Sequence, residues 1–180
     1  WITLINAVRA VFTGKIIYAA DWGKVKDIAI WDLVDIIGVD AYVPLSTVEN
    51  PTVEQIVSGW NSVPAYPEWA HNVTNDMTPV DFYRSLSVTY SKPLMFTELG
   101  YRNDGDAVKE PGSWGTAAAR NDELQARAYE AYIQVWGNMA SWFAGALFWN
   151  YEASGTDIES KNFSPQNRVA EVVITNFFKE

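Results

Sequence analysis

The residues of this sequence that are best suited to chemistry are acidic side chains placed where predicted strands end. Glu98 closes the most apolar run of the chain and follows Leu94 and Phe96 at a spacing of two. Because side chains alternate along a strand, we expect these three to share one face. A carboxylate in such a place is costly to bury and is usually either ion-paired or catalytic. Glu98 is therefore a candidate catalytic carboxylate, and an ion pair with Arg102 or Lys92 is the alternative.

Two further polar side chains are predicted to share a face of a neighbouring strand. Asp40 and Tyr42 stand two residues apart at the end of the apolar run 36–42. The hydroxyl of Tyr42 could donate a hydrogen bond to a carboxylate, which would orient the carboxylate and favour its ionised form. The alternative for Tyr42 is a packed aromatic ring. Asp40 is either a ligand contact or half of a salt bridge across the sheet, and the sequence favours the salt bridge.

Aromatic side chains are unusually frequent, with 9 Trp, 9 Tyr and 8 Phe in 180 residues. Trp and Tyr often hold flat, partly polar ligands, and sugars are ligands of this kind. Trp22 and the pair Trp149 and Asn150 follow predicted strands, where an indole face could stack on a sugar ring. Core packing is the alternative for each tryptophan. Three more candidates lie in long loops, as platforms or as loop anchors: Trp69, Tyr101 and Trp114.

Composition and charge exclude several other classes of function. The formal net charge of −9 argues against nucleic acid or an anionic membrane surface as a partner, because both are bound through Lys and Arg. The chain has no cysteine, and a lone His71 builds neither a metal site nor a Ser-His-Asp triad. No apolar run approaches the ~20 residues of a membrane span. We therefore expect carboxylate chemistry without a metal or a cofactor.

Four apolar runs of strand length alternate with helical patterns along the chain. The runs are 15–20, 36–42, 93–98 and 144–150, and the helical patterns are 1–13, 28–33, 52–60, 79–90, 121–140 and 165–178. Such alternation predicts an α/β fold of parallel βα units with right-handed crossovers. For the last helix, Ser164 is expected as the N-cap and Pro165 as the first helical residue.

Four βα units form either a small open sheet or half of a (βα)8 barrel, since a complete TIM barrel typically needs ~250 residues. Each predicted strand ends in polar or aromatic residues, which is the edge where barrels build their active sites. A doubly wound nucleotide-binding sheet would need a glycine-rich turn after a strand, and no such motif occurs. We therefore expect residues 1–180 to form a single, partial TIM-barrel domain.

The sequence resembles the C-terminal half of glycoside hydrolase family 113, which consists of TIM-barrel enzymes of clan A that act on β-1,4-mannan. The resemblance covers nearly the whole chain and keeps the order of the motifs. They are Lys15-Ile-Ile-Tyr-Ala-Ala-Asp-Trp22, Trp31-Asp-Leu-Val-Asp-Ile-Ile-Gly-Val-Asp-Ala-Tyr42, Phe96-Thr-Glu-Leu-Gly-Tyr101, Phe148-Trp-Asn-Tyr151 and Phe163-Ser-Pro-Gln-Asn-Arg-Val-Ala170. The resemblance implies that the four strands are strands five to eight of the barrel.

The resemblance also implies roles for single residues. Glu98 matches the family's nucleophile, Tyr42 the tyrosine that hydrogen-bonds it, and Trp149 the tryptophan under the sugar at the cleavage subsite. The implied reaction is retaining hydrolysis, in which a second carboxylate protonates the leaving oxygen. The family's acid/base Glu follows an Asn, and this chain contains no Asn-Glu dipeptide. We expect the acid/base in an absent N-terminal half, with Asp21 or Glu152 as weaker internal candidates.

Three functions follow as hypotheses. The first is a retaining hydrolase, or its catalytic C-terminal half, that cleaves β-mannan or a related β-glycan; without its acid/base the isolated chain is expected to have little activity. The second is a non-catalytic carbohydrate-binding half-barrel, and the third is a structural domain. Open barrel edges also predict self-association. A polymer substrate is the only indication of an extracellular or cell-envelope location.

Overall fold

A computed structural model describes residues 1–139, 141–152, 155, 157 and 159–179 of the chain. The elements follow one another as α1 (Ile2–Arg9), β1 (Ile17–Asp21), two 3-10 turns η1 (Val25–Asp27) and η2 (Trp31–Leu33), β2 (Ile36–Asp40), α2 (Val53–Trp60), α3 (Ala70–Val73), α4 (Pro79–Tyr90), β3 (Leu94–Leu99), α5 (Asp122–Trp136), β4 (Phe143–Phe148) and α6 (Val169–Phe177).

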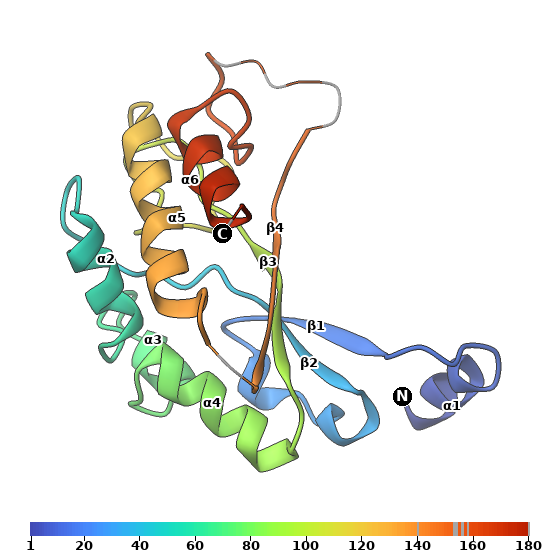
Figure 1. Cartoon of the computed structure of the whole chain (residues 1–180). Helices are drawn as coiled ribbons and strands as arrows, with labels where there is room; N and C mark the ends of the chain where they lie inside the picture. Colours follow the sequence, from blue (N-terminus) through green and yellow to red (C-terminus); the bar gives the residue numbers. More distant parts are fainter. Residues whose placement is uncertain (140, 153–154, 156, 158, 180) are drawn as a thin grey trace.

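The four strands form one parallel sheet in the order β1-β2-β3-β4, which is also their order along the chain. Each strand is joined to the next by a segment that crosses over one face of the sheet (Figure 1). This confirms the prediction of parallel βα units. Because all four strands run the same way, their carboxyl ends and the loops that follow meet at a common edge.

One face of the sheet is packed and the other is open. Helices α2 to α6 lie on a single side of the strands, whereas α1 lies apart from them beyond β1 (Figure 1). The packed face holds an aromatic core around Phe96 of β3. Its ring lies 4.7 Å from Trp136, 5.6 Å from Tyr83 and 6.0 Å from Trp60, measured between ring centroids. These rings fasten α5, α4 and α2 to the sheet.

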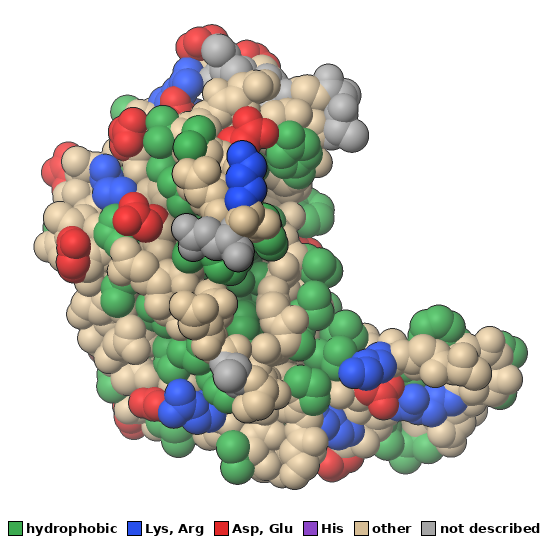
Figure 2. All heavy atoms as spheres, in the orientation of Figure 1, with side chains coloured by type: hydrophobic (Ala, Val, Ile, Leu, Met, Phe, Trp, Pro, Cys, Tyr) green, Lys and Arg blue, Asp and Glu red, His purple; other side chains and the backbone are tan. Residues whose placement is uncertain are grey.

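The open face gives the molecule a crescent shape, with a hollow on the side away from the helices (Figure 2). Apolar side chains are exposed at both edge strands: Ile17 of β1 is 38% exposed and Leu147 of β4 is 55% exposed. In a closed barrel, residues on such a face fill the interior. None of the helices that the structure describes is long and apolar enough to cross a membrane.

The structure corrects several predicted boundaries. Helix α1 is shorter than 1–13, and the stretch 28–33 contains only the short turn η2. Helix α3 directly follows Trp69, within one of the long loops expected from the sequence. Helix α6 begins at Val169 rather than at Pro165, because Asn167 has a left-handed φ of 60° that a helix cannot include. Ser164 accepts a hydrogen bond from the backbone of Gln166 in a turn instead.

Candidate active site

Three carboxylates lie in a row across the carboxyl ends of neighbouring strands. Asp21 of β1 is the register partner of Asp40 of β2, and Asp40 is the partner of Glu98 of β3. Adjacent strands are ~4.8 Å apart, so the row spans about two strand spacings, or ~10 Å. The sequence prediction that acidic side chains gather at this edge is confirmed for these three.

A β-bulge at Thr97 sets the direction of Glu98. Val39 pairs with Phe96 and the next residue, Asp40, pairs with Glu98, so Thr97 is an extra residue in β3. Phe96 is buried against the helices, while Glu98 is only partly buried. The expectation that Leu94, Phe96 and Glu98 share one face is therefore wrong, because the bulge shifts the alternation by one residue.

Tyr42 and Glu98 are joined by a hydrogen bond, which the phenol hydroxyl donates to Oε2 of Glu98 over 2.9 Å. Burial raises the pKa of Tyr42 well above its usual value, and the hydrogen bond to Glu98 adds to this effect. The hydroxyl therefore keeps its proton and remains a donor. The edge of the Phe163 ring packs against Tyr42 at a centroid distance of 6.1 Å, which fixes the phenol from behind.

The alternative for Glu98, an ion pair with Lys92 or Arg102, is not formed. The ammonium group of Lys92 donates to backbone carbonyls of the segment 31–34. The guanidinium of Arg102 binds the buried carboxylate of Asp104 over 3.0 Å. Both cations are thus engaged away from the site, and the direct partner of the Glu98 carboxylate in the described structure is a neutral phenol.

Asp40 accepts a hydrogen bond of 2.9 Å from the hydroxyl of Thr97. Burial raises the pKa of Asp40; the bond from Thr97 opposes this shift, and the nearby charge of Asp21 adds to it. Among the residues that the structure describes, Asp40 forms no ion pair, so the predicted salt bridge across the sheet is wrong. The bulge residue Thr97, which the sequence did not single out, holds this carboxylate beside Glu98.

Trp149 borders the row of carboxylates on the β4 side. It directly follows β4, its backbone N–H donates to the carbonyl of Leu99 over 2.8 Å, and it is 37% exposed. A Cβ atom on Gly100 would lie 2.0 Å from the carbonyl oxygen of Trp149, so only glycine allows this approach. The exposed ring of Trp114 lies edge-on to Trp149 at 6.4 Å. Asn150 follows, partly buried.

Two of the predicted binding residues are covered. Trp22 is 8% exposed, and its indole is stacked on the exposed ring of Trp69. Tyr101 is 1% exposed and packs edge-on against Tyr129 of α5 at 5.3 Å. The structure therefore does not bring Tyr101 to the open edge of the sheet. The ring of Trp69, which is exposed, covers the ring of Trp22.

A polar network joins the segment that follows β3 to the segment that follows β4. The side-chain amide of Asn103 donates to Asp122 over 2.7 Å, and its oxygen accepts from the backbone of Asn162 over 2.8 Å. The neighbouring Phe163 packs on Trp114 at 5.0 Å as well as on Tyr42. This network fixes the aromatic rings around the site. Asn103 stands 19 residues from Asp122 and 59 residues from Asn162, so no local pattern reveals the network.

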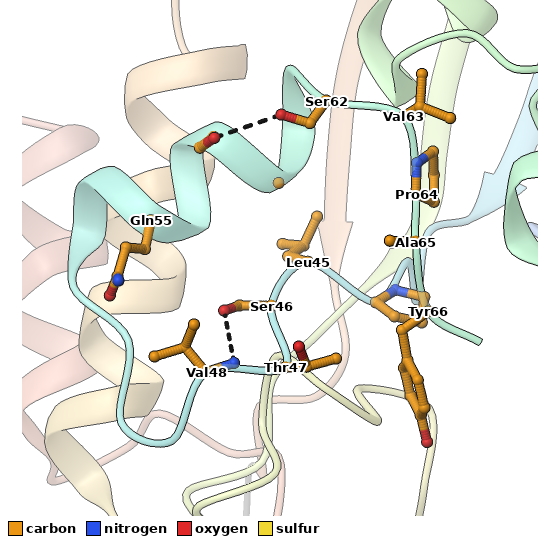
Figure 3. A pocket seen from close by; sticks show the side chains of 13 residues that line it. Leu45, Ser46, Thr47, Val48, Gln55, Ser62, Val63, Pro64, Ala65 and Tyr66 are labelled. Atoms are coloured by element: carbon orange, nitrogen blue, oxygen red, sulfur yellow. Dashed lines mark hydrogen bonds between the residues drawn. The ribbon is translucent and has the colours of Figure 1, made fainter. Parts of the chain in front are cut away.

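A separate cavity of about 240 Å³ lies between the segment after β2, helix α2 and the segment 62–66 (Figure 3). Hydroxyl groups line part of it, including Ser58 and Ser62, whose oxygens are 3.4 Å apart. None of its lining residues is an acid or a base except for the phenol of Tyr66. It therefore lacks the carboxylates that hydrolysis would require.

Comparisons with known proteins agree with this geometry. Two solved structures described as GH113 β-1,4-mannanases superpose on the whole chain with TM-scores of 0.75 and 0.77, at 20% and 21% identity. The GH113 β-mannanase AaManA from Alicyclobacillus acidocaldarius, in complex with ManMIm, gives 0.73 at 22% identity over 99% of the chain. A comparison with curated protein sequences gives no match.

The chain spans 50% of the length of each of these three mannanase chains, so its four βα units form half of a TIM barrel of this type. The model of Glycoside Hydrolase Family 113 matches residues 1–168. This match contains all four strands and every residue of the site described above. The chain belongs to glycoside hydrolase family 113.

Proposed function

We propose that this chain provides the nucleophile side of a retaining glycoside hydrolase site, with Glu98 as the nucleophile. The observation that carries the proposal is the hydrogen bond from Tyr42 to Oε2 of Glu98 at the open carboxyl edge of the half-barrel. A neutral donor orients the carboxylate and leaves its second oxygen available for attack, whereas an ion pair with Lys92 or Arg102 would occupy it.

In the proposed reaction, an oxygen of Glu98 attacks the anomeric carbon while the bond to the leaving oxygen breaks. A glycosyl ester forms, and the leaving group departs with the bonding electron pair. A second carboxylate at ~5 to 5.5 Å normally protonates that oxygen and then activates water to hydrolyse the ester. We place this acid/base outside these 180 residues, in the complementary half of the barrel. The substrate is β-1,4-mannan or a related β-glycan, as the names of the similar structures suggest.

A covalent trapping experiment tests the nucleophile without requiring the acid/base. The chain is incubated with a fluoro-mannoside whose leaving group, dinitrophenolate, departs without protonation. We expect its mass to increase by one fluoroglycosyl group, located by peptide mass spectrometry on the peptide that contains Glu98. The variant Glu98→Gln should remain unlabelled while keeping the wild-type Tm.

Labelling at another carboxylate would overturn the assignment of Glu98. A chain that binds β-1,4-linked oligosaccharides but is never labelled would instead be a non-catalytic carbohydrate-binding half-barrel. A chain that neither binds nor is labelled would contradict both functions.

A further inference from the structure

An exposed tryptophan lies at the β1 end of the row of carboxylates. Trp69 is stacked on Trp22 with ring centroids 5.3 Å apart and an angle of 20° between the planes. Trp22 is 8% exposed, while Trp69 is 52% exposed. One side of the Trp69 indole is therefore supported by the core and the rest of the ring faces water.

The position of Trp69 is fixed by the segment that carries it. Trp69 immediately precedes α3, whose residues Ala70 and Val73 are buried in the core. The ammonium group of Lys26 donates to the carbonyl of Asn72, which ties α3 to the loop after β1. The anchored segment thus keeps the large apolar ring of Trp69 exposed to solvent, at a position where a polar side chain would cost less free energy.

The indole of Trp69 lies next to Asp21, the carboxylate at the β1 end of the row. A Cβ atom built on Gly23 would lie 3.0 Å from Oδ1 of Asp21 and 3.6 Å from the indole of Trp69, so the two groups are neighbours. Asp21 is two strands away from Glu98 in the sheet, a distance of ~10 Å. Trp69 therefore lies beyond Asp21, at the opposite end of the row from Trp149.

We propose that Trp69 is the platform of a distal sugar subsite, which stacks on a pyranose ring of a β-1,4-linked glycan while another ring of the same chain lies at Glu98. The C–H face of a pyranose packs on an indole, and the carboxylate of Asp21 beside the indole can accept a hydrogen bond from a sugar hydroxyl. The inference rests on the proposed function and adds a preference for long oligosaccharides. A disaccharide at Glu98 is too short to reach Trp69.

Calorimetric titration of the chain with manno-disaccharide and manno-hexasaccharide tests this. We expect Trp69→Ala to weaken hexasaccharide binding roughly 3- to 10-fold, the range of an aromatic contact, and to leave disaccharide binding unchanged. Trp1→Ala is the matched control, because Trp1 is 61% exposed and contacts Tyr18 on α1's side of the molecule. It should bind both sugars as the wild type does.

Removal of Trp69 uncovers Trp22, which could replace it, so a second measurement is needed. The indole N–H signal of Trp69 should shift in NMR spectra on addition of hexasaccharide but not of disaccharide, and that of Trp1 should not move. Equal hexasaccharide affinity in Trp69→Ala together with an unmoved Trp69 signal would overturn the subsite while leaving the hydrolase proposal intact. A wild-type chain that binds neither sugar would contradict the proposed function itself.

Discussion

Asp40 lies opposite Glu98 across β2 and β3, although the preceding residue, Val39, lies opposite Phe96. The single extra residue, Thr97, places two consecutive side chains of β3 toward the end of β2: Thr97 donates to Asp40, and Glu98 accepts from Tyr42. Bulges are known to re-aim side chains next to active sites. In this chain the bulge turns Glu98 away from the helices and toward the open face.

The hydrogen bond to Glu98 is expected to contribute to reactivity. Tyr42→Phe removes only the donor, and a hydrogen bond to a charged group contributes about 1.5–3 kcal/mol. We expect covalent labelling by the activated fluoro-mannoside to slow by roughly 10- to 100-fold, because the carboxylate loses the donor that orients it. We expect Tm to fall by a few degrees, because the same hydrogen bond contributes to stability. Tyr132→Phe is the control, since its ring packs on Phe148 on the helix side of the sheet. Equal labelling rates for Tyr42→Phe and the wild type would show that Tyr42 is only a packed ring.

Asp40 is expected to lower stability at neutral pH. Burial raises its pKa above 3.8, so the folded state holds the proton more tightly than the unfolded chain does. The cost of the charge is absent below pH 3.8 and develops as the pH rises through the folded-state pKa. Asp40→Asn should therefore raise Tm at neutral pH, and this gain should shrink on acidification. A loss of Tm at neutral pH would mean that the charge itself is stabilising.

Asp122 should behave in the opposite way and provides a comparison. Burial acts to raise its pKa, but hydrogen bonds from Arg120 and Asn103 outweigh burial and lower it below 3.8. Its charge therefore stabilises the fold above pH 3.8, and this contribution is lost as the pH falls through the folded-state pKa. Asp122→Asn should lower Tm at neutral pH, and its difference from wild type should shrink in acid. Thermal unfolding followed by circular dichroism at neutral pH and below pH 3.8 checks the sign of the Tm difference from wild type for both variants.

Much of the fold could be predicted from local signals. Helix α4 occupies the predicted 79–90 because Thr78 caps it, Pro79 begins it and Ser91 adopts the left-handed conformation that ends it. The strands were recognisable as apolar runs between such helices. Helix α6 could not be placed correctly, since its start depends on the left-handed Asn167 and on hydrogen bonds from the neighbouring Arg168 back to Asn162 and Ser160.

The site was predictable where a residue type and a strand end coincide, as for Glu98 and Tyr42. It was not predictable where the position depends on contacts between distant segments. Thr97 acquires its role from a bulge, and Phe163 acquires its role by packing under Tyr42 and Trp114. Tyr101 illustrates the converse, because a loop aromatic that could have been a platform is buried against α5.

Gly100 should be required for the position of Trp149. A methyl group there would meet the Trp149 carbonyl at 2.0 Å. Overpacking of this kind costs about 1–3 kcal/mol, which corresponds to a Tm lower by roughly 2 to 12 °C for a chain of this size. Gly115→Ala is the matched control, since a Cβ there would have no atom within 4 Å. We expect Gly100→Ala to lower Tm and oligosaccharide affinity and Gly115→Ala to change neither. A Tm of Gly100→Ala equal to that of the wild type would contradict the close approach of Gly100 to the Trp149 carbonyl.

The open face of the sheet should cause the isolated chain to self-associate. Among the described residues, strands β1 and β4 are the two edges of the sheet, and each leaves the backbone groups of one side without a neighbouring strand. Leu147, at 55% exposure, adds apolar surface beside the β4 edge. A second copy can pair with these edges and cover the hollow, whereas the net charge of −9 opposes but does not prevent such contacts.

Sedimentation velocity over a range of concentrations measures this association. We expect the wild type to shift toward dimers as its concentration rises and Leu147→Lys to remain monomeric at the same concentrations, because a lysine would bring a charge into the buried contact. Val88→Lys adds the same charge at a residue of α4, on the helix side, that is 69% exposed, and it should associate as the wild type does. If Val88→Lys blocks association as strongly as Leu147→Lys, then the helices rather than the open sheet form the contact.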